Sequence, residues 1–427
     1  MPRGILSLSR IRWSIGINLN LSAELLSNGK THRDIELTGF QNRAVLLLIT
    51  AALLASCGGG GGSKGKSREP YQYTTPSAIG DGWQVASLAD EGMDEALITN
   101  MMERIHNGSF EGIDAIAIAR NNKLVLAEQI RTEIGDFDGW VGNRDPERHI
   151  LHSTSKSFTS ALIGIAIDQG AIASTQVKFY DMFNYGAYDN WDPRKAEMTL
   201  EDALTMRLGI EWDEWSLPYT DPNNDLVFLE NNNFDWSKAL LDLPLTSDPG
   251  TVYAYNTAAT IAIGQALENA TGIPMAEFAN QHLFHPMQIF DAVWATSPSG
   301  LPIGGSGLYL TIRDLLKFGQ LYIDDGVWQG QQLISPAWIA DSVVRRVDIS
   351  SWSTRFEAYG FQWWLAEFIH GAGHVDAWVT AGYGGQYSFS FPELDLVIAF
   401  QGQNYENGPG VANLYVMVQD YILRSIN

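Results

Sequence analysis

Residues 152–170 have the sequence HSTSKSFTSALIGIAIDQG, in which a short polar stretch leads directly into a dense apolar run. The apolar run predicts a buried helix that begins near Ser153. Ser153 and Lys156 stand three positions apart, and a helix places residues at that spacing on one face. A serine hydroxyl becomes a nucleophile when a neighbouring base removes its proton. Lysine can be that base once burial or nearby positive charge lowers its pKa.

The same residues have a simpler interpretation as an ordinary helix start. Ser153 or Thr154 would then cap a core helix, and Lys156 would be solvated. Serine and lysine at this spacing also recur by chance, so the pair alone does not separate the two interpretations.

Two later segments favour the catalytic interpretation. Residues 248–257, DPGTVYAYNT, precede a helix-like run at 258–272. Residues 380–386, TAGYGGQ, lead into a stretch that predicts two strands joined at 392–395.

The residues before the helix start also have recognisable patterns. Residues 94–105 predict an amphipathic helix that ends before His106-Asn107-Gly108. Short apolar runs at 113–119 and 124–128 are separated by a polar turn, which predicts a hairpin.

With these motifs in this order, the chain resembles the serine β-lactamase and penicillin-binding-protein superfamily from about Trp83 to its carboxyl terminus. The similarity is greatest to the β-lactamase-related branch, which contains class C β-lactamases, D-amino-acid peptidases, esterases and 6-aminohexanoate-dimer hydrolase. Further matches are Leu204-Thr205-Met206 with Gly209, Gly307-Leu308-Tyr309, Arg313-Asp314-Leu315 and Phe318-Gly319. The resemblance implies an α/β (α+β) fold of the β-lactamase/transpeptidase type. An antiparallel sheet would be flanked by helices, with an all-helical subdomain inserted at about residues 157–300.

The resemblance also implies a role for each motif residue. Ser153 is expected to be the acylated nucleophile, Lys156 its general base, and Tyr255 the group that passes the proton to the leaving group. A free phenol has a pKa of about 10, so Tyr255 would need a cationic neighbour such as Lys156 to ionise near neutral pH. The backbone N–H groups of Ser153 and Tyr383 are expected to form an oxyanion hole, where one donor is commonly worth about 3 kcal/mol.

The motifs depart from the family pattern at two places. Thr257 stands where the Y-x-N motif ends in asparagine, and Asn256 is expected to point elsewhere. Thr380-Ala381-Gly382 replaces K-T-G or H-T-G, so the cation that anchors a substrate carboxylate is missing. Thr257, Thr380 and Gly382 remain the expected substrate-binding positions.

These residues predict a serine acyl hydrolase of the esterase or amidase type, which works through a Ser153 acyl-enzyme with Lys156 and Tyr255 as general base and acid. It would need no cofactor and no metal, and its partner would be a small ester, amide or peptide-like substrate. One alternative is a β-lactamase or D,D-peptidase, against which the missing carboxylate-anchoring cation argues. The other is a catalytically inactive relative that binds peptidoglycan or a peptide, against which the joint presence of serine, lysine and tyrosine argues.

Composition and charge limit the possible partners. The chain of 427 residues is 45% hydrophobic and 18% charged, which excludes a disordered protein. The formal net charge is −22, although the first 70 residues carry 9 basic and 4 acidic side chains, so the remainder is more acidic still. Such a body repels phosphate backbones, and no nucleic-acid partner is expected.

The amino end predicts an export signal. An apolar run at 44–56 follows Arg43 and ends directly at Cys57; its 13 residues are too few for a membrane-spanning helix, which needs about 20. Leu54-Ala55-Ser56-Cys57 resembles a bacterial lipobox, which implies lipidation of Cys57 and a cell-envelope location. Gly58 after the cysteine favours the outer membrane, facing the periplasm. The alternative is a buried apolar strand with a chance cysteine.

We therefore expect a leader and lipoprotein signal at 1–57, a Gly-rich flexible linker at 58–82 and the hydrolase domain at 83–427. The linker contains accidental matches to a phosphate-binding loop at 60–67 and to a nucleophile elbow at 61–65. Both motifs need a following helix, and the next residues, REPYQYTTP, cannot form one.

Two kinds of pattern could indicate other chemistry. Three histidine pairs have the helical spacing of zinc ligands but are more simply explained as aromatic packing positions; they are His149 with His152, His282 with His285, and His370 with His374. Asp213 and Glu214 form an acidic pair, but glycosidases need their carboxylates on opposed walls.

Two further alternatives stay open. The acidic, aromatic stretch at 211–236 either floors a substrate cleft or packs around a loop; its aromatic residues include Trp212, Trp215, Tyr219 and Trp236. Tyr253 could also be the motif tyrosine, although its spacing from Pro249-Gly250 favours Tyr255.

Overall fold

The computed structural model describes residues 70–135, 137, 145–405 and 408–426. The leader, Cys57 and residues 58–69 of the expected linker lie outside these ranges, so the export signal and its lipidation stay predictions. Within the described ranges, no helix combines the length and the apolar character that a membrane crossing requires.

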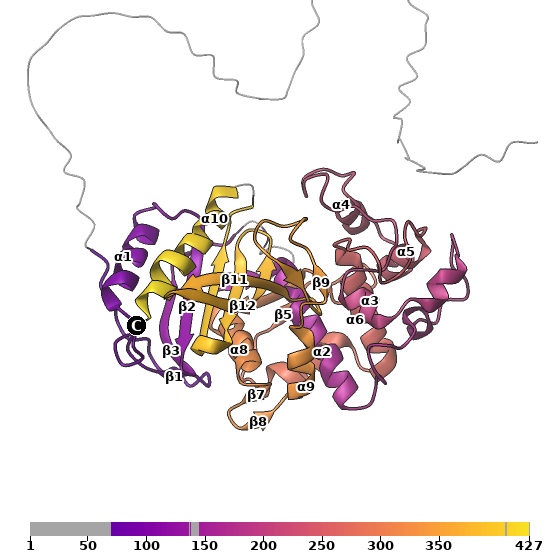
Figure 1. The fold of residues 1–427 in the computed structure, drawn as a ribbon. Coiled ribbons are helices and arrows are strands. Elements are labelled where there is room, and N and C mark those ends of the chain that lie inside the picture. The colour runs from indigo at the N-terminus through magenta and orange to yellow at the C-terminus, as the bar shows by residue number, and fades with distance from the viewer. Residues whose placement is uncertain (1–69, 136, 138–144, 406–407, 427) are drawn as a thin grey trace, which may run out of the picture. The chain divides into compact units, whose positions relative to one another are not determined.

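A nine-stranded sheet, in the order β1-β3-β2-β14-β13-β12-β11-β10-β9, runs through the domain (Figure 1). Neighbouring strands are antiparallel, apart from β1 and β3, which are parallel. This confirms the antiparallel sheet that the sequence predicts. The strands are β1 (Gln84–Val85), β2 (Ile113–Arg120), β3 (Lys123–Gln129), β9 (Val347–Asp348), β10 (Ala358–Tyr359), β11 (Trp364–His370), β12 (Gly373–Gly382), β13 (Gln386–Phe391) and β14 (Leu396–Gly402).

The predicted elements before the helix start are present. The first helix, α1 (Glu95–His106), is capped by Asp94, whose carboxylate accepts a hydrogen bond from the Ala96 N–H at 2.8 Å. The hairpin of β2 and β3 turns at Asn121 and Asn122, which both have positive φ angles, of 50° and 58°. Asparagine tolerates this left-handed conformation better than most residues, so the polar turn suits its sequence.

The two faces of β2 show why helices cover both sides of the sheet. Ile116 and Ile118 pack on the side of α1 and α10 (Gly408–Val416), where large side chains fill the space. Ala115 and Ala117 alternate with them and face α8 (Ile312–Ile323) on the other side. The small alanines let that helix approach the sheet closely. Figure 1 shows α1 and α10 together beside the strands.

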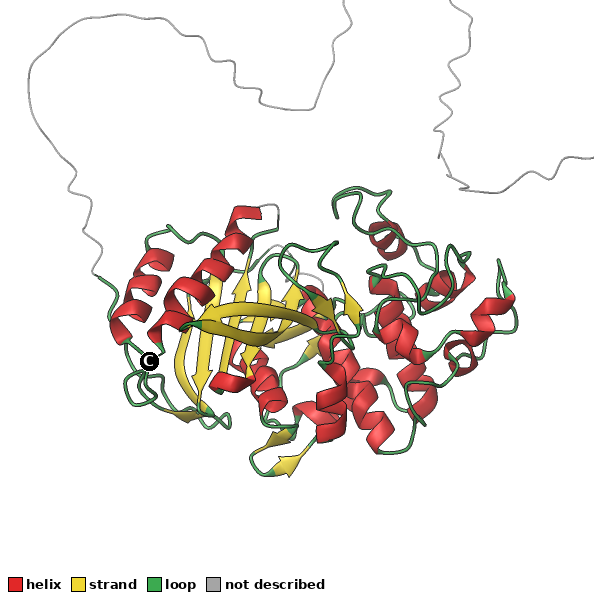
Figure 2. Ribbon diagram, viewed as in Figure 1, coloured by secondary structure: helices red, strands yellow, loops and turns green. Residues whose placement is uncertain are grey.

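Between β4 (Arg148–Ile150) and β5 (Val293–Trp294), the regular elements are all helical, and they are joined by loops that contain isolated β-bridges (Figure 2). This part of the chain overlaps the segment that the sequence predicts to be helical, at about 157–300, but that segment extends past it and includes β5. Its elements are η2 (His152–Thr154), α2 (Ser155–Asp168), η3 (Phe179–Met182), η4 (Pro193–Glu197), α3 (Leu200–Leu204), α4 (Asp225–Glu230), α5 (Trp236–Asp242), α6 (Thr257–Thr271), α7 (Met275–Ala279) and η5 (Asn280–Phe284).

Short elements complete the described part of the chain. A three-stranded sheet has the order β4-β6-β5, and β7 pairs with β8. The remaining elements are β6 (Leu308–Thr311), β7 (Val327–Trp328), β8 (Gln331–Gln332), α9 (Pro336–Ser342), η6 (Pro392–Leu394), η7 (Met417–Ile422) and η8 (Leu423–Ser425).

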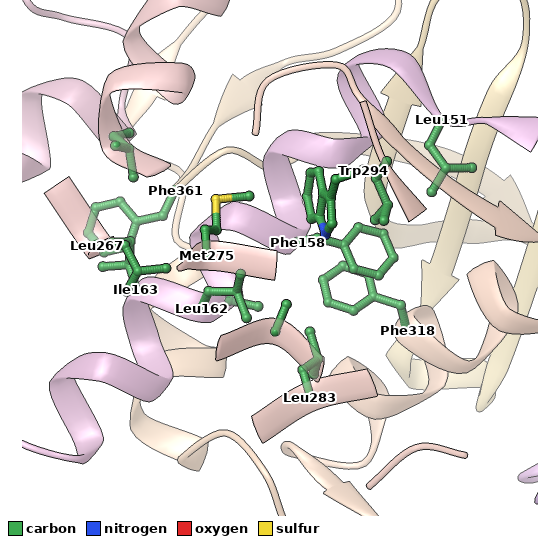
Figure 3. Close-up of a cluster of buried hydrophobic side chains, with 14 of the residues drawn as sticks. Leu151, Phe158, Leu162, Ile163, Leu267, Met275, Leu283, Trp294, Phe318 and Phe361 are labelled. Carbon is green, nitrogen blue, oxygen red and sulfur yellow. The ribbon is translucent and has the colours of Figure 1, made fainter. Parts of the chain in front are cut away.

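Helix α2 lies inside the hydrophobic core. Every side chain from Ser155 to Ala166 is buried, including the polar ones in the first two turns, so no face of this part of the helix meets solvent. Phe158 stacks on Phe318 of α8 with ring centroids 3.7 Å apart (Figure 3). Gly164 meets the Trp338 ring so closely that an added Cβ would lie 2.4 Å from it. This packing fixes the helix that follows Ser153.

Candidate active site

Ser153 lies in the short η2 turn immediately before α2, and it is partly exposed while its neighbours are buried. The preceding residue, His152, has a left-handed φ of 45°, which a non-glycine residue rarely adopts. The Thr154 hydroxyl donates to the Gln386 carbonyl at 2.7 Å instead of capping the helix. The strained turn therefore presents the serine to solvent, and the ordinary cap that the sequence also allowed is not formed.

Lys156 is buried against Ser153. Its Nζ donates to the Ser153 hydroxyl at 3.0 Å, to the Thr257 hydroxyl at 2.9 Å and to the Gly305 carbonyl at 2.8 Å. The residue is only 1% exposed, so the solvated lysine of the simpler interpretation is wrong. Burial lowers the pKa of Lys156 to about 8, although the nearby carboxylates of Glu214 and Glu230 act to raise it. A useful fraction of the amine is therefore neutral and can accept a proton near neutral pH.

Tyr255 completes the contacts around Ser153. Its phenol hydrogen-bonds to Ser153, and the Lys156 Nζ lies 4.8 Å from the ring centroid. Burial raises the pKa of Tyr255 and the nearby Glu214 carboxylate raises it further, so the phenol is protonated. The pKa of Tyr255 is therefore shifted away from neutral, contrary to the expectation that Lys156 would bring it down, and only the hydrogen bond with Ser153 lowers it. The alternative motif residue, Tyr253, instead packs against aromatic rings, including that of Trp352 at 5.4 Å.

The buried Glu214 carboxylate is linked to Lys156 through Thr257. It is 1% exposed and accepts hydrogen bonds from the Thr257 N–H and hydroxyl, each at 2.7 Å. It also accepts from the Trp212 indole at 2.8 Å and the Tyr219 phenol at 3.2 Å. The Thr257 hydroxyl thus donates to Glu214 and accepts from Lys156. Thr257, expected to bind substrate, instead connects the lysine to this carboxylate.

No sequence pattern indicated this role of Glu214. It was singled out only as half of an acidic pair, and the two acids have different environments. Asp213 is exposed and accepts from the Ser216 N–H at 2.9 Å within its own loop. Asn256, next to Thr257, caps α6 by accepting from the Ala259 N–H at 2.9 Å, so it points away as expected.

The end of β12 packs against the chain that leads into Ser153. An added Cβ on Gly382 would lie 2.2 Å from the Leu151 carbonyl oxygen, so only glycine allows this approach. Tyr383 follows, and its ring lies 5.7 Å from that of His152. The strand end is therefore beside Ser153, where the expected oxyanion hole requires it. Thr380 is fully buried and its hydroxyl accepts from the Ser388 N–H at 3.2 Å, so it is directed into the sheet.

Two cavities meet at Ser153, which lines both. The first, which we call the Glu230 cavity, has a volume of about 680 Å³, and its walls include Phe137, His152, Tyr219, Glu230, Tyr383 and Tyr405. The second, the Trp215 cavity, has a volume of about 860 Å³, and its walls include Trp215, Tyr255, Trp352, Arg355, Trp364 and Tyr387. Both are large enough for a small organic substrate.

The aromatic stretch at 211–236 contributes both to the cavities and to the core. Trp215 and Tyr219 line the cavities, as one interpretation predicted. Trp236 is 4% exposed, and its indole donates to the Asn232 carbonyl at 3.0 Å, as the packing interpretation predicted. Sequence patterns did not single out Arg355, an exposed residue between β9 and β10 that supplies a cation to the Trp215 cavity.

Among the described residues, no group of three or more histidine, cysteine or acidic side chains is arranged so that it could hold a metal ion. His149 contacts the Asp114 carboxylate at 2.9 Å, and His282 pairs with Gln169 at 3.1 Å. His370 and His374 lie on the paired strands β11 and β12, so their presumed helical spacing is wrong.

Comparisons with known proteins show which sequences and folds this chain resembles. The family model described as Beta-lactamase matches residues 95–417. The 6-aminohexanoate-dimer hydrolase of Paenarthrobacter ureafaciens is 25% identical over 304 residues, which cover 67% of this chain and 71% of that protein.

Two solved structures illustrate the similarity of fold. EstCE1, a hydrolase with promiscuous acyltransferase activity, superposes with a TM-score of 0.57 at 16% identity, covering 76% of this chain and 97% of its own. The octameric penicillin-binding protein homologue from Pyrococcus abyssi superposes with a TM-score of 0.53 at 15% identity, covering 76% of each chain.

Proposed function

This chain belongs to the beta-lactamase family, a family of hydrolases, and we propose that it cleaves esters or amides through an acyl-enzyme formed on Ser153. The observation that carries the proposal is the 3.0 Å contact between the Lys156 Nζ and the Ser153 hydroxyl. The amine is buried and its pKa is lowered to about 8, so it is suited to accept the serine proton.

In the first step, neutral Lys156 takes the proton of Ser153 while the serine oxygen attacks the substrate carbonyl. The carbonyl oxygen gains the negative charge, which backbone N–H groups of Ser153 and Tyr383 would stabilise at about 3 kcal/mol per donor. The carbon–leaving-group bond then breaks. Tyr255 hydrogen-bonds to Ser153 and would pass a proton to the departing oxygen or nitrogen, which leaves an acylated Ser153.

Water reverses the same steps in the second half of the reaction. Its proton passes to the lysine–tyrosine pair while its oxygen attacks the acyl carbon, and Ser153 recovers its proton as the carboxylic acid leaves. The protonated Lys156 formed in each half is held by Thr257 and Gly305 and lies near Glu214. These acceptors keep the amine directed at Ser153 throughout.

Esters and amides without a carboxylate are the preferred substrates because Thr380-Ala381-Gly382 lacks the cation of the K-T-G motif. Similar proteins include a 6-aminohexanoate-dimer hydrolase, a D-stereospecific amidohydrolase from a Streptomyces species and a hydrolase with promiscuous acyltransferase activity, which supports this reaction class. A second candidate, a β-lactamase or D,D-peptidase, is favoured by one observation. Arg355 lines the Trp215 cavity and could pair with a substrate carboxylate from that side.

The test is intact-protein mass spectrometry after exposing the full-length protein to a fluorophosphonate. We expect a single adduct on the parent and on Ser157→Ala, a control on the same helix whose hydroxyl donates to the buried Gln362 carbonyl. No adduct should form on Ser153→Ala. A folded parent that stays unlabelled would overturn the proposal and favour an inactive binding protein. For a labelled protein, rates with a p-nitrophenyl ester, an anilide and a β-lactam rank the two candidates.

We also propose that Cys57 is lipidated and that the protein is anchored in a bacterial envelope membrane. The support is the lipobox-like sequence Leu54-Ala55-Ser56-Cys57 after an apolar run. Expression in a bacterial host with radiolabelled palmitate should label the parent and fail to label Cys57→Ala. Equal labelling of both proteins would reject the anchor.

A further inference from the structure

The expected oxyanion hole takes its second donor from a hairpin turn. Residues 382–386 join β12 to β13, and the Gly385 N–H donates to the Gly382 carbonyl at 3.2 Å across the turn. The N–H and C=O of a trans peptide point in opposite directions, so the Tyr383 N–H points away from the inside of the turn. Gly382, Tyr383 and Ser153 line the same cavity. The position of the turn relative to Ser153 therefore decides whether the Tyr383 N–H can serve as an oxyanion donor.

The side chain of Gln386 attaches this turn to the sheet. Gln386 is fully buried, and the pairing of β13 with β14 ends at Tyr387 and Phe400. Beyond that pair, the Gln386 Nε2 donates to the Gly402 carbonyl at 2.5 Å, and the Gly402 N–H donates to the Gln386 Oε1 at 3.3 Å. The side-chain amide thus extends the ladder as a backbone peptide would. The same Nε2 lies 3.5 Å from the Tyr383 carbonyl oxygen.

The backbone of Gln386 is attached to the segment that carries the nucleophile. The Gln386 carbonyl accepts from the Thr154 hydroxyl at 2.7 Å, and Thr154 is fully buried. Thr154 directly follows Ser153 in η2. One residue is therefore bonded to the segment of the first expected donor, the Ser153 N–H, and to the strand end beside the second, the Tyr383 N–H.

We propose that Gln386 is a positioning residue, which sets the separation of the Ser153 and Tyr383 N–H groups in the oxyanion hole. Such donors act when they lie about 2.7–3.1 Å from the developing negative charge, so a small shift of the turn lowers their effect. Removal of the amide would leave the buried Gly402 N–H and carbonyl without these partners and let the turn move. This role rests on the proposed acyl-enzyme chemistry. A merely structural glutamine would support the sheet and leave the stabilisation of the transition state unchanged.

A pair of substrates reports on the oxyanion hole. They are a p-nitrophenyl ester and the matching thionoester, in which sulfur replaces the carbonyl oxygen. Sulfur is a weak hydrogen-bond acceptor, so the thionoester gains little from the N–H donors. The ratio of kcat/KM for the ester to kcat/KM for the thionoester therefore measures how well the donors are placed. Fluorophosphonate titration of Ser153 gives the concentration of active enzyme in each full-length protein.

Gln386→Met keeps the length of the side chain and removes its amide. We expect kcat/KM for the ester to fall about 10- to 100-fold, mainly through kcat, since loss of a whole donor costs about 100- to 1,000-fold. Thionoester hydrolysis should fall much less, so the ratio should drop about tenfold. Gln401→Met is the matched control, because Gln401 is also fully buried and its amide donates to the Leu310 carbonyl of β6 at 3.0 Å. It should lower the free energy of unfolding and leave the ratio at the parental value.

Thr154→Val tests the other contact of Gln386 and decides the question if Gln386→Met does not fold. Valine keeps the shape of threonine and removes the hydroxyl that donates to the Gln386 carbonyl, so the ratio should fall. Thr154→Ser keeps the hydroxyl and should retain the parental ratio.

A parental ratio in a folded Gln386→Met protein, or an equal loss on ester and thionoester, would overturn the proposal. If that protein does not fold, a parental ratio in Thr154→Val does the same. Either result with a parent that fluorophosphonate labels rejects the role of Gln386 alone and keeps the hydrolase function. A folded parent without an adduct overturns both.

Discussion

The Thr257 hydroxyl accepts a hydrogen bond from the Lys156 Nζ at 2.9 Å and donates one to the buried Glu214 carboxylate at 2.7 Å. The position where related motifs carry asparagine therefore holds Lys156, the proposed general base, in place. A hydroxyl suits this position because it can donate and accept at once. An amide that contacted substrate directly would leave the Glu214 carboxylate without this donor.

Thr257→Val should slow the labelling of Ser153 by about 10- to 100-fold, since a hydrogen bond to a charged group is worth about 1.5–3 kcal/mol. Valine keeps the shape of threonine and removes both hydrogen bonds of the hydroxyl. Thr257→Ser restores the hydroxyl and should recover most of the rate. Stopped-time fluorophosphonate labelling measures both, and a serine variant as slow as the valine variant would argue that packing, and not the hydroxyl, matters.

The acylation rate should rise with pH through a midpoint near 8. Only neutral Lys156 can accept the serine proton, and burial lowers its pKa to about 8, so the neutral fraction grows from pH 6 to 9. The initial rate of p-nitrophenol release from a p-nitrophenyl ester, corrected for spontaneous hydrolysis, gives the pH profile. A rate that is flat across this range would remove Lys156 from the role of base.

Glu214→Gln should move that midpoint to lower pH. The Glu214 carboxylate stabilises the charged lysine and raises its pKa, so loss of the negative charge makes the amine easier to deprotonate. Glu211→Gln removes an equal charge from an exposed position nearby and should leave the midpoint in place. A lower rate without a shifted midpoint would indicate that Glu214 serves the fold only.

Tyr255→Phe should affect an alkyl ester more than a p-nitrophenyl ester. Nitrophenolate leaves without a proton, whereas an alkoxide needs one, and a general acid contributes about 100- to 10,000-fold. Tyr253→Phe is the matched control, because Tyr253 packs among rings two residues away. If the Tyr253 variant showed the larger, leaving-group-dependent loss, the motif tyrosine would have been assigned to the wrong residue.

Gly382→Ala should destabilise the strand end beside Ser153. The new Cβ would lie 2.2 Å from the Leu151 carbonyl oxygen, a backbone atom that cannot turn aside. Such overpacking typically costs about 1–3 kcal/mol. Gly373→Ala, at the other end of the same strand, meets no atom within 4 Å and should cost little. Urea unfolding gives the free energy of unfolding of each variant, and equal values would show that the strand end can relax.

Local patterns predicted much of the fold. The polar turn of the β2–β3 hairpin and the cap of α1 depend on residues close in the chain, and the sequence displays them directly. The catalytic candidates Ser153, Lys156 and Tyr255 were found by spacing and resemblance, and the structure brings them into contact.

Features that depend on burial could not be predicted in this way. Glu214 looks like any acid in an acidic loop until folding surrounds it with four donors. The pKa of Tyr255 is raised by burial and by the Glu214 carboxylate, and neither is visible in the local sequence. Arg355 lies in a loop that precedes the K-T-G position in the sequence, and it lines the Trp215 cavity together with Gly382 only in the folded chain.

The burial of α2 on all sides has a consequence for the durability of the enzyme. The core around α2 contains residues of the sheet and of the neighbouring helices. We therefore expect the backbone amide hydrogens of α2 to exchange with solvent mainly when the whole domain opens. Ser153 lies in the turn immediately before that helix, so we expect the packing of α2 to hold it in place until the domain melts. Heat inactivation should therefore coincide with global melting, and the working lifetime of the nucleophile equals the lifetime of the fold.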